Sequence, residues 1–186
     1  SVEREEVFRL AAELEGHPDN AAAAVYGGGV AVGPGGRVAP LDVHPASRLL
    51  VAIPATTLST AAARAALRAP VPTALAARTA GRLAFLVEGL RRGDPGLLAE
   101  AAGDELHEQR RRRLSPLTGR LVEAARAAGA AHAAWSGAGP AALAVVTTKT
   151  AAAVRRAWEG LVGAGGEVWE PGIDRQGLLW DQVGDS

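Results

Sequence analysis

Cysteine is missing from all 186 residues of the sequence. Its absence excludes a disulfide framework, a thiolate zinc site and a cysteine nucleophile. A reducing compartment suits such a chain, and we expect a cytoplasmic location. Methionine is also missing, even at position 1, and the sequence opens directly in a charged helical pattern. We take this to indicate that the natural protein has residues upstream of Ser1.

Long apolar runs and an excess of one charge are lacking too. The uninterrupted apolar stretches are rich in alanine and shorter than the ~18 residues of a membrane-spanning helix, and no basic-then-apolar leader opens the chain. The 20 lysines and arginines balance the 20 aspartates and glutamates. No net field would attract nucleic acid or an anionic membrane, so we expect neither as a partner.

The periodicity of apolar residues predicts alternating helices and short strands. Residues 3–14 have the spacing of an amphipathic helix that ends at Gly16 and Pro18, and a short helical turn and a glycine bend follow Asn20. Leu75, Thr79, Leu83, Leu86 and Leu90 are predicted to form the inner stripe of a longer helix. Further helices are expected from Ser59 or Thr60 to Leu67 and around residues 117–128 and 154–161, and strands at 30–32, 37–43, 49–53, 131–135, 141–147 and 167–169.

The order of these elements favours the α+β class. After Arg48 the chain reads strand, several helices, two strands, helix and strand, which suits an antiparallel sheet backed by helices. Residues 1–45 resemble the end of a preceding domain whose own sheet is incomplete. We therefore divide the chain into a first part, 1–45, and a second domain, 46–186.

A dense polar cluster follows the first predicted helix. Glu13, Glu15, His17, Asp19 and Asn20 lie within eight residues. The cluster is either a solvated helix end followed by an Asp-Asn turn, or a site where a glutamate holds a divalent cation and Asp19 or Asn20 orients a hydroxyl for phosphoryl transfer. The residues alone leave these two interpretations about evenly matched.

Two other segments could bind an anion. Ser136-Gly137-Ala138-Gly139-Pro140 joins two predicted strands, and its glycines could expose backbone amides, although a plain hairpin turn is the simpler interpretation. Four consecutive arginines, residues 110–113, precede Leu114. Such a run usually forms a solvated face, as does an isolated helix arginine such as Arg64, but a guanidinium can also pair bidentately with a carboxylate or phosphate.

Taken in order, these segments resemble a known family. Glu-Gly-His-Pro-Asp-Asn, Gly-Gly, Leu-Ser-Thr-x-x-x-Arg, Leu106-His107 with an arginine before Leu-x-Pro, and Ser-Gly-Ala-Gly-Pro together resemble bacterial homoserine kinases of the GHMP small-molecule kinase superfamily. The resemblance runs from Glu13 to about Trp169. It implies a ferredoxin-like sandwich with an antiparallel sheet, preceded by the tail of an N-terminal ribosomal-protein-like domain, and it implies a homodimer.

The resemblance also implies roles for individual residues. ATP would be the co-substrate and Mg²⁺ the cofactor, with Glu13 or Glu15 at the metal position. His17 matches the histidine that helps to bind homoserine, and Asp19 and Asn20 match the residues near the reacting hydroxyl. The substrate carboxylate would be held by Arg64 and Arg111, and the glycine motif beside the nucleotide loop would be Gly137, Ala138 and Gly139.

One departure from the family pattern matters for activity. The Pro-x-x-x-Gly-Leu-Gly-Ser-Ser-Ala segment, which would hold the nucleotide phosphates at a helix N-terminus, does not occur in these residues. We expect a parent protein that phosphorylates the hydroxyl of L-homoserine, a step toward threonine, and a 186-residue chain that is inactive by itself. The alternatives are another GHMP kinase, acting on a sugar or isoprenoid alcohol, and a non-catalytic α+β assembly domain.

Overall fold

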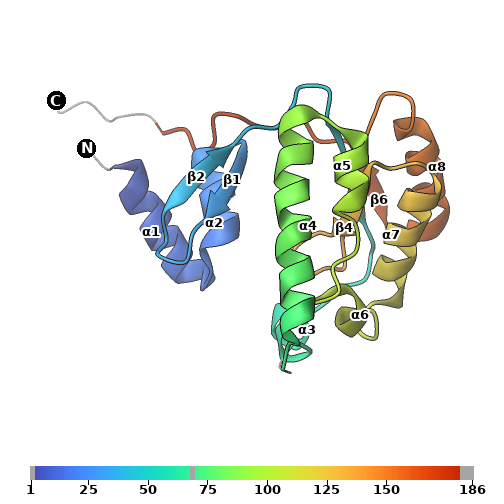
Figure 1. Ribbon diagram of the computed structural model, residues 1–186, viewed down its shortest axis with the longest axis horizontal. Coiled ribbons are helices and arrows are strands. Elements are labelled where there is room, and N and C mark those ends of the chain that lie inside the picture. The colour runs from blue at the N-terminus through green and yellow to red at the C-terminus, as the bar shows by residue number, and fades with distance from the viewer. Residues whose placement is uncertain (1–2, 68–69, 181–186) are drawn as a thin grey trace. The chain divides into compact units, whose positions relative to one another are not determined.

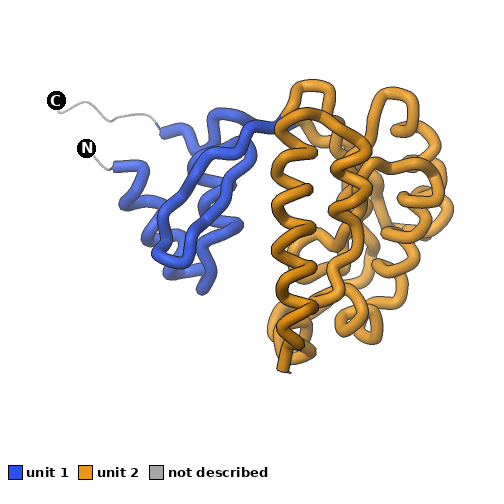
Figure 2. The backbone as a smooth tube through the Cα atoms, in the orientation of Figure 1, with its two compact units in different colours: residues 1–43, 173–186 blue, residues 44–172 orange. Residues whose placement is uncertain are grey.

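The computed structural model describes residues 3–67 and 70–180 (Figure 1). Helices and antiparallel sheets make up the chain, so the predicted α+β class is confirmed. The described residues form two compact units, shown in Figure 2. Unit 1 contains the residues up to Val43 and those from Ile173 onward, and unit 2 contains His44–Gly172. The domain division at 45/46 stays a prediction, because compactness alone does not assign domains.

Unit 2 is built on a four-stranded antiparallel sheet with the order β4-β5-β3-β6. The central pair, β3 and β5, aligns Leu50 with Ala144. Both strands are short apolar runs, the pattern expected of strands covered on both faces. The strands are β3 (Arg48–Ile53), β4 (His132–Trp135), β5 (Ala142–Val146) and β6 (Glu167–Trp169).

Helices cover both faces of this sheet. One face packs on α7 (Pro116–Ala127) and α8 (Ala151–Val162), where Trp158 is fully buried and its indole Nε1 donates a hydrogen bond to the Leu121 carbonyl over 2.8 Å. The other face packs on α4 (Thr73–Arg92) and α5 (Pro95–Glu100). The alternation of strand side chains supplies both cores, since neighbouring residues of one strand point to opposite faces.

Two short helices complete unit 2, namely α3 (Thr60–Ala65) and α6 (Glu108–Arg111). Ser59 caps α3, because its hydroxyl accepts a hydrogen bond from the Ala62 amide at 3.4 Å. The prediction of a helix that begins at Ser59 or Thr60 is therefore confirmed. Neither α5 nor α6 is predicted by apolar periodicity, since each helix is too short to show a repeating pattern.

Unit 1 contains two helices and a hairpin. α1 (Arg4–Glu15) and α2 (Pro18–Tyr26) pack together, and β1 (Gly29–Val32) pairs with β2 (Val38–Leu41) in an antiparallel ribbon. The buried core is small and consists of Phe8, Ala21, Ala22 and Val25. The rings of Phe8 and Tyr26 lie 5.6 Å apart at a tilted angle.

The segment after Gly172 returns to unit 1. Gly28 donates its amide to the Asp174 carbonyl at 2.6 Å, and Leu178 donates to the Val25 carbonyl at 3.2 Å. The Arg4 guanidinium donates to two carbonyls of the same segment, those of Gln176 and Leu178. The two backbone bonds attach the segment to the C-terminal end of α2, at Val25, and to the glycine bend that follows it, at Gly28.

Two sequence predictions need correction. Leu83 does not belong to the inner stripe of α4, because its side chain is 59 % exposed and the half-buried Arg82 lies in the stripe between Thr79 and Leu86. The segment after Gly16 is not merely a helical turn that begins beyond Asn20. It is the first turn of α2, in which Pro18 occupies the start position that proline favours. No helix among the described residues is long and apolar enough to span a membrane.

Candidate functional site

In unit 2, the guanidinium of Arg111 lies against the glycine loop between β4 and β5. Its Nη1 donates to the Gly137 carbonyl at 2.9 Å. Its Nε is buried and has no hydrogen-bond partner among the described residues. A buried N–H without an acceptor is costly, and a bound anion is the kind of acceptor that would satisfy it.

The glycine loop is held in one shape by its own backbone and by α7. The Ser136 amide donates to the Ala141 carbonyl at 2.9 Å, and Thr118 of α7 donates its hydroxyl to the Pro140 carbonyl at 2.7 Å. Gly139 has a φ of 88°, and a Cβ there would lie 2.7 Å from the Trp135 ring. Only glycine suits this position, since both the backbone conformation and the ring exclude a side chain. Arg111 therefore faces a fixed carbonyl.

A second positive charge acts on Arg111. Burial lowers the pKa of Arg111, the negative charge of Asp104 raises it, and the positive charge of Arg64 lowers it, with a net decrease. A like charge nearby disfavours the charged form of a partly desolvated group. Arg64, which is exposed on α3, is thus near enough for its charge to act on Arg111.

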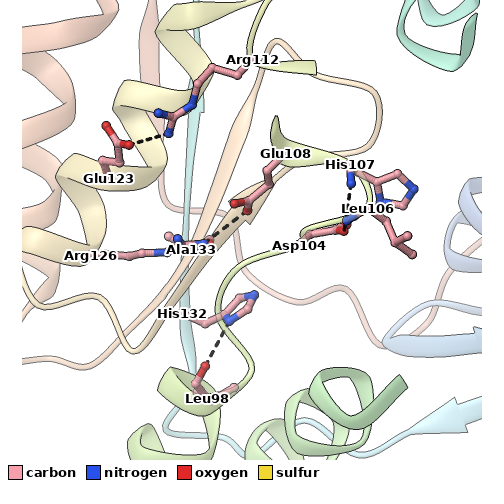
Figure 3. A network of polar contacts seen from close by, with 10 residues as sticks. All are labelled: Leu98, Asp104, Leu106, His107, Glu108, Arg112, Glu123, Arg126, His132 and Ala133. Carbon is pink, nitrogen blue, oxygen red and sulfur yellow. Dashed lines mark hydrogen bonds and ion pairs between the residues drawn. The ribbon is translucent and has the colours of Figure 1, made fainter. Parts of the chain in front are cut away.

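The turn before Arg111 is organised by Asp104 (Figure 3). Its Oδ1 accepts hydrogen bonds from the amides of Leu106 at 2.9 Å and His107 at 3.0 Å, and the ring Nδ1 of His107 contacts Oδ2. Burial opposes ionisation of Asp104, but the hydrogen bonds and charge of His107 outweigh it and lower the pKa of the carboxyl. Asp104 is therefore an ionised carboxylate fixed at the start of the segment that ends in Arg111.

Glu108 of α6 is held by a separate ion pair. Its Oε1 accepts a hydrogen bond from Arg126 Nη2 at 3.2 Å, and the same nitrogen donates to the Ala133 carbonyl at 2.8 Å. Burial raises the pKa of Glu108, although the positive charge of Arg126 works against this shift. Figure 3 shows this pair beside His132, whose Nδ1 lies 3.1 Å from the Leu98 carbonyl oxygen.

A small cavity lies where these groups meet. It measures about 80 Å³ and presents a guanidinium and two carboxyl groups together with the glycine loop. This space suits one small charged group. Its lining residues are Asp104, His107, Glu108, Arg111, Ala134, Trp135 and Gly137.

The remaining candidates lie in unit 1, around the junction of α1 and α2. Gly16 ends α1 with a left-handed φ of 72°, and the Nδ1 of His17 lies 2.6 Å from the Glu15 carbonyl oxygen. Asp19 and Asn20 occupy the first turn of α2, where the Asp19 carboxylate accepts the Asn20 amide at 2.9 Å. Both are exposed, and an acidic residue there is stabilised by the positive end of the helix dipole.

The two carboxylates proposed for metal binding are Glu13 and Glu15, both exposed on α1. Glu13 forms an ion pair with Arg9 at 3.0 Å. Residues two apart on a helix do not share a face, so one cation could use only one of them. The described residues contain no cluster of three potential metal-ligating side chains. A cation here would therefore take most of its ligands from phosphate oxygens and water, as Mg²⁺ usually does.

Three residues of this region, Asp104, Glu108 and Arg126, were not predicted from the sequence. Asp104 had a recognisable signal, because an aspartate three residues before His107 can accept amides from the turn that follows it. Arg126 had none, since it lies in the last turn of α7, where a basic residue is common.

Comparison with known proteins assigns the fold. Residues 86–163 match the family described as GHMP kinases C terminal. This segment of the chain is therefore similar to the C-terminal domain of GHMP kinases. It is 37 % identical over 166 residues to the homoserine kinase of Synechococcus sp. strain CC9605, covering 85 % of this chain and 53 % of that protein. It is 43 % identical over 150 residues to the homoserine kinase of Gloeobacter violaceus, with 80 % and 50 % covered.

Structural comparison agrees. The crystal structure of homoserine kinase from Cytophaga hutchinsonii matches with a TM-score of 0.88 and 28 % identity, over 95 % of this chain and 60 % of that one. A mevalonate kinase from L. major, solved with R-mevalonate, shares the fold at a TM-score of 0.70 and 22 % identity. The resemblance to homoserine kinases is confirmed, and the chain spans about half the length of the curated relatives it matches.

Proposed function

We propose that the protein containing this chain is a homoserine kinase, which transfers the γ-phosphoryl group of ATP to the side-chain hydroxyl of L-homoserine. The observation that carries the proposal is the guanidinium of Arg111 beside the glycine loop, whose buried Nε has no acceptor among the described residues. The positive charge of Arg64 also acts on Arg111. A pair of guanidiniums suits the carboxylate of an amino acid. The 37–43 % identity to homoserine kinases supports the same substrate.

In this proposal each candidate site residue has the role that the resemblance to homoserine kinases implies. Arg64 and Arg111 hold the carboxylate, while His17 contributes to binding. Asn20 and Asp19 position the hydroxyl so that it attacks the phosphorus in line. A strong base is not needed, since phosphoryl transfer passes through a loose transition state.

The nucleotide side of the reaction rests on groups outside these residues. Mg²⁺, when bound, would neutralise charge on the phosphates, and Glu13 or Glu15 could supply one carboxylate ligand. The sequence contains no glycine-rich phosphate loop, so we propose that the 186 residues alone are inactive and are not stabilised by ATP. Product formed by the isolated chain with Mg-ATP and homoserine would contradict this point. A homodimer and a cytoplasmic location also stay predictions.

The central test replaces Arg111 in the complete protein. Arg111→Leu should raise the KM for homoserine by roughly ten- to hundredfold, because a charge-assisted pair contributes about 1.5–3 kcal/mol. The KM for ATP should change little. Steady-state kinetics with each substrate varied in turn gives both values.

Arg112→Leu is the matched control for this test. Arg112 is the adjacent arginine, but its guanidinium pairs with the exposed Glu123 of α7, away from the glycine loop. Exposed pairs of this kind contribute little to stability or binding. Equal damage by the two substitutions, or equal changes in both KM values, would show that Arg111 does not hold the substrate carboxylate.

A second candidate is a GHMP kinase for an alcohol without a carboxylate-ammonium pair. It is favoured only by the shared fold with the mevalonate kinase. Sugar alcohols do not require two arginines, so the guanidinium pair argues against them. A panel of homoserine, mevalonate and a hexose, assayed with the complete protein, separates the possibilities.

A further inference from the structure

The 80 Å³ cavity of unit 2 pairs opposite charges. The Arg111 guanidinium and the Asp104 carboxylate both line it, and the negative charge of Asp104 favours the charged form of Arg111. An anion such as phosphate would be attracted by Arg111 and repelled by Asp104. An α-amino acid presents a carboxylate and an ammonium group on the same carbon, so a zwitterion matches this lining better than a simple anion does.

Asp104 is prepared to accept such an ammonium group. Its Oδ1 is occupied by two backbone amides, and its Oδ2 has one recorded donor among the described residues, the His107 ring. A carboxylate oxygen accepts about two hydrogen bonds, so Oδ2 has room for another N–H. The side chain is 34 % exposed, and its orientation is fixed by the turn.

Glu108 is the other carboxylate in the cavity, and it already has a cationic partner within the protein. It is ion-paired with Arg126, and its side chain is only 16 % exposed. If Glu108 bound a ligand in place of Arg126, the partly buried charge of Arg126 would lose its partner, which is costly. The Nε of Arg126 already has no acceptor among the described residues. Asp104 is therefore the carboxylate that remains available to a ligand.

We propose that Asp104 binds the α-ammonium group of the substrate whose carboxylate is held by Arg64 and Arg111. It thereby selects amino acids over hydroxy acids of the same length that lack the amino group. This inference rests on the proposed homoserine kinase function and adds the specificity residue that the arginine pair does not provide.

The test compares homoserine with 4-hydroxybutanoate, which has the same chain, hydroxyl and carboxylate but no amino group. The KM for homoserine and the inhibition constant of 4-hydroxybutanoate against it are measured for the complete wild-type protein and for Asp104→Asn. Asparagine keeps an oxygen for the two backbone amides but removes the negative charge. The KM for homoserine should rise roughly ten- to hundredfold, while the inhibition constant should stay unchanged or fall.

The chain offers a matched control in Asp94. Its Oδ1 accepts the amides of Gly96 at 2.8 Å and Leu97 at 3.2 Å, the same two- and three-residue spacing that Asp104 uses. Asp94 caps α5 and does not line the cavity. Asp94→Asn should leave both constants at their wild-type values.

The outcomes separate this inference from the function on which it rests. If wild type phosphorylates homoserine and Asp104→Asn weakens both ligands equally, Asp104 only caps the turn and the inference is overturned. The same holds if neither constant changes. If wild type does not phosphorylate homoserine, the proposed function fails, and the assignment of Asp104 fails with it. A selective loss of homoserine binding supports both.

Discussion

Unit 2 and unit 1 differ in how completely each buries its own apolar residues. In unit 2, both faces of the sheet are covered, and thirteen buried residues around Trp158 form one cluster. In unit 1, four buried residues form the core, and an open cleft of about 1030 Å³ runs past Phe8, Tyr26 and Val30. Because burial of apolar surface is the main stabilising contribution, unit 2 should be the more stable of the two.

This difference bears on the two groups of candidate site residues. Arg111 and the glycine loop belong to the consolidated unit, where Thr118 and the loop backbone fix their geometry. Asp19 and Asn20 belong to α2, whose packing depends on α1 and on the segment after Gly172. The geometry around Arg111 should therefore be well fixed, whereas the geometry of Asp19 and Asn20 depends on a small core.

The largest expected effect comes from truncating one large buried side chain in the core of each unit. Trp158→Ala should lower the free energy of unfolding of unit 2 by about 3–5 kcal/mol, because a fully buried indole and its hydrogen bond to Leu121 are lost. Phe8→Ala, at a ring that borders the open cleft, should cost less than Trp158→Ala. Denaturant unfolding, with hydrogen exchange to assign each loss to its unit, measures both.

The comparison would be wrong if Phe8→Ala proved as costly as Trp158→Ala. It would also be wrong if amides of α2 were protected from exchange as strongly as those of β3 and β5. Protection at the level of global unfolding is expected for the central strands, and weaker protection for unit 1.

A smaller effect is expected where the chain returns to unit 1. A Cβ at Gly177 would lie 2.5 Å from the Val25 carbonyl oxygen, and the φ of Gly177 is +67°. Gly177→Ala should therefore destabilise unit 1 by about 1–3 kcal/mol through overpacking and strain. Gly172→Ala is the control, since a Cβ there has nothing within 4 Å. Faster exchange confined to α2 in the first variant, and unchanged exchange in the second, is the expected result.

The sequence predicted the elements of this fold that depend on short local patterns, and it failed where long-range contacts decide. The strands of unit 2 were found because each is a short apolar run ended by proline, glycine or polar residues. The position of Leu83 was mistaken because a leucine and an arginine, one residue apart, both fit the helical period. Arg82 takes the partly buried place, where it pairs with Glu105 at 3.1 Å. Periodicity alone does not reveal such pairing.

The site shows the same limit. Four adjacent arginines look alike in the sequence, and Arg111 was distinguished from its neighbours only by the family resemblance. The structure separates them by their partners, since Arg110 bonds to the Leu67 carbonyl, Arg111 to Gly137 and Arg112 to Glu123. These contacts join residues 11 to 43 positions apart, which no local pattern encodes. The assignment of site residues stays a prediction until the substitutions are made.

The smallest expected effect is on the pH dependence of stability. It tests whether burial of His132 in unit 2 changes the pH at which this side chain is protonated. His132 is 7 % exposed, and burial lowers its pKa, the Leu98 carbonyl partly opposes this, and the charge of Arg126 adds to it. Arg82, Asp104 and Glu108 line the same cavity as His132. The unfolded chain therefore takes up the imidazole proton at a higher pH than the folded chain does.

The sign follows from this order of protonation. The contribution of neutral His132 is fully present above the unfolded pKa of about 6.5 and is lost as the pH falls toward the lower folded value. Glu108, whose pKa is raised by burial, acts in the opposite direction, so the pH dependence of wild type alone does not isolate the effect of His132. His132→Asn retains a side-chain donor for the Leu98 carbonyl but does not titrate. The advantage of wild type over His132→Asn in unfolding free energy should shrink between about pH 7 and about pH 5. A constant difference over that range would show that His132 titrates at the same pH in the folded and unfolded chains, and that burial does not set its pKa.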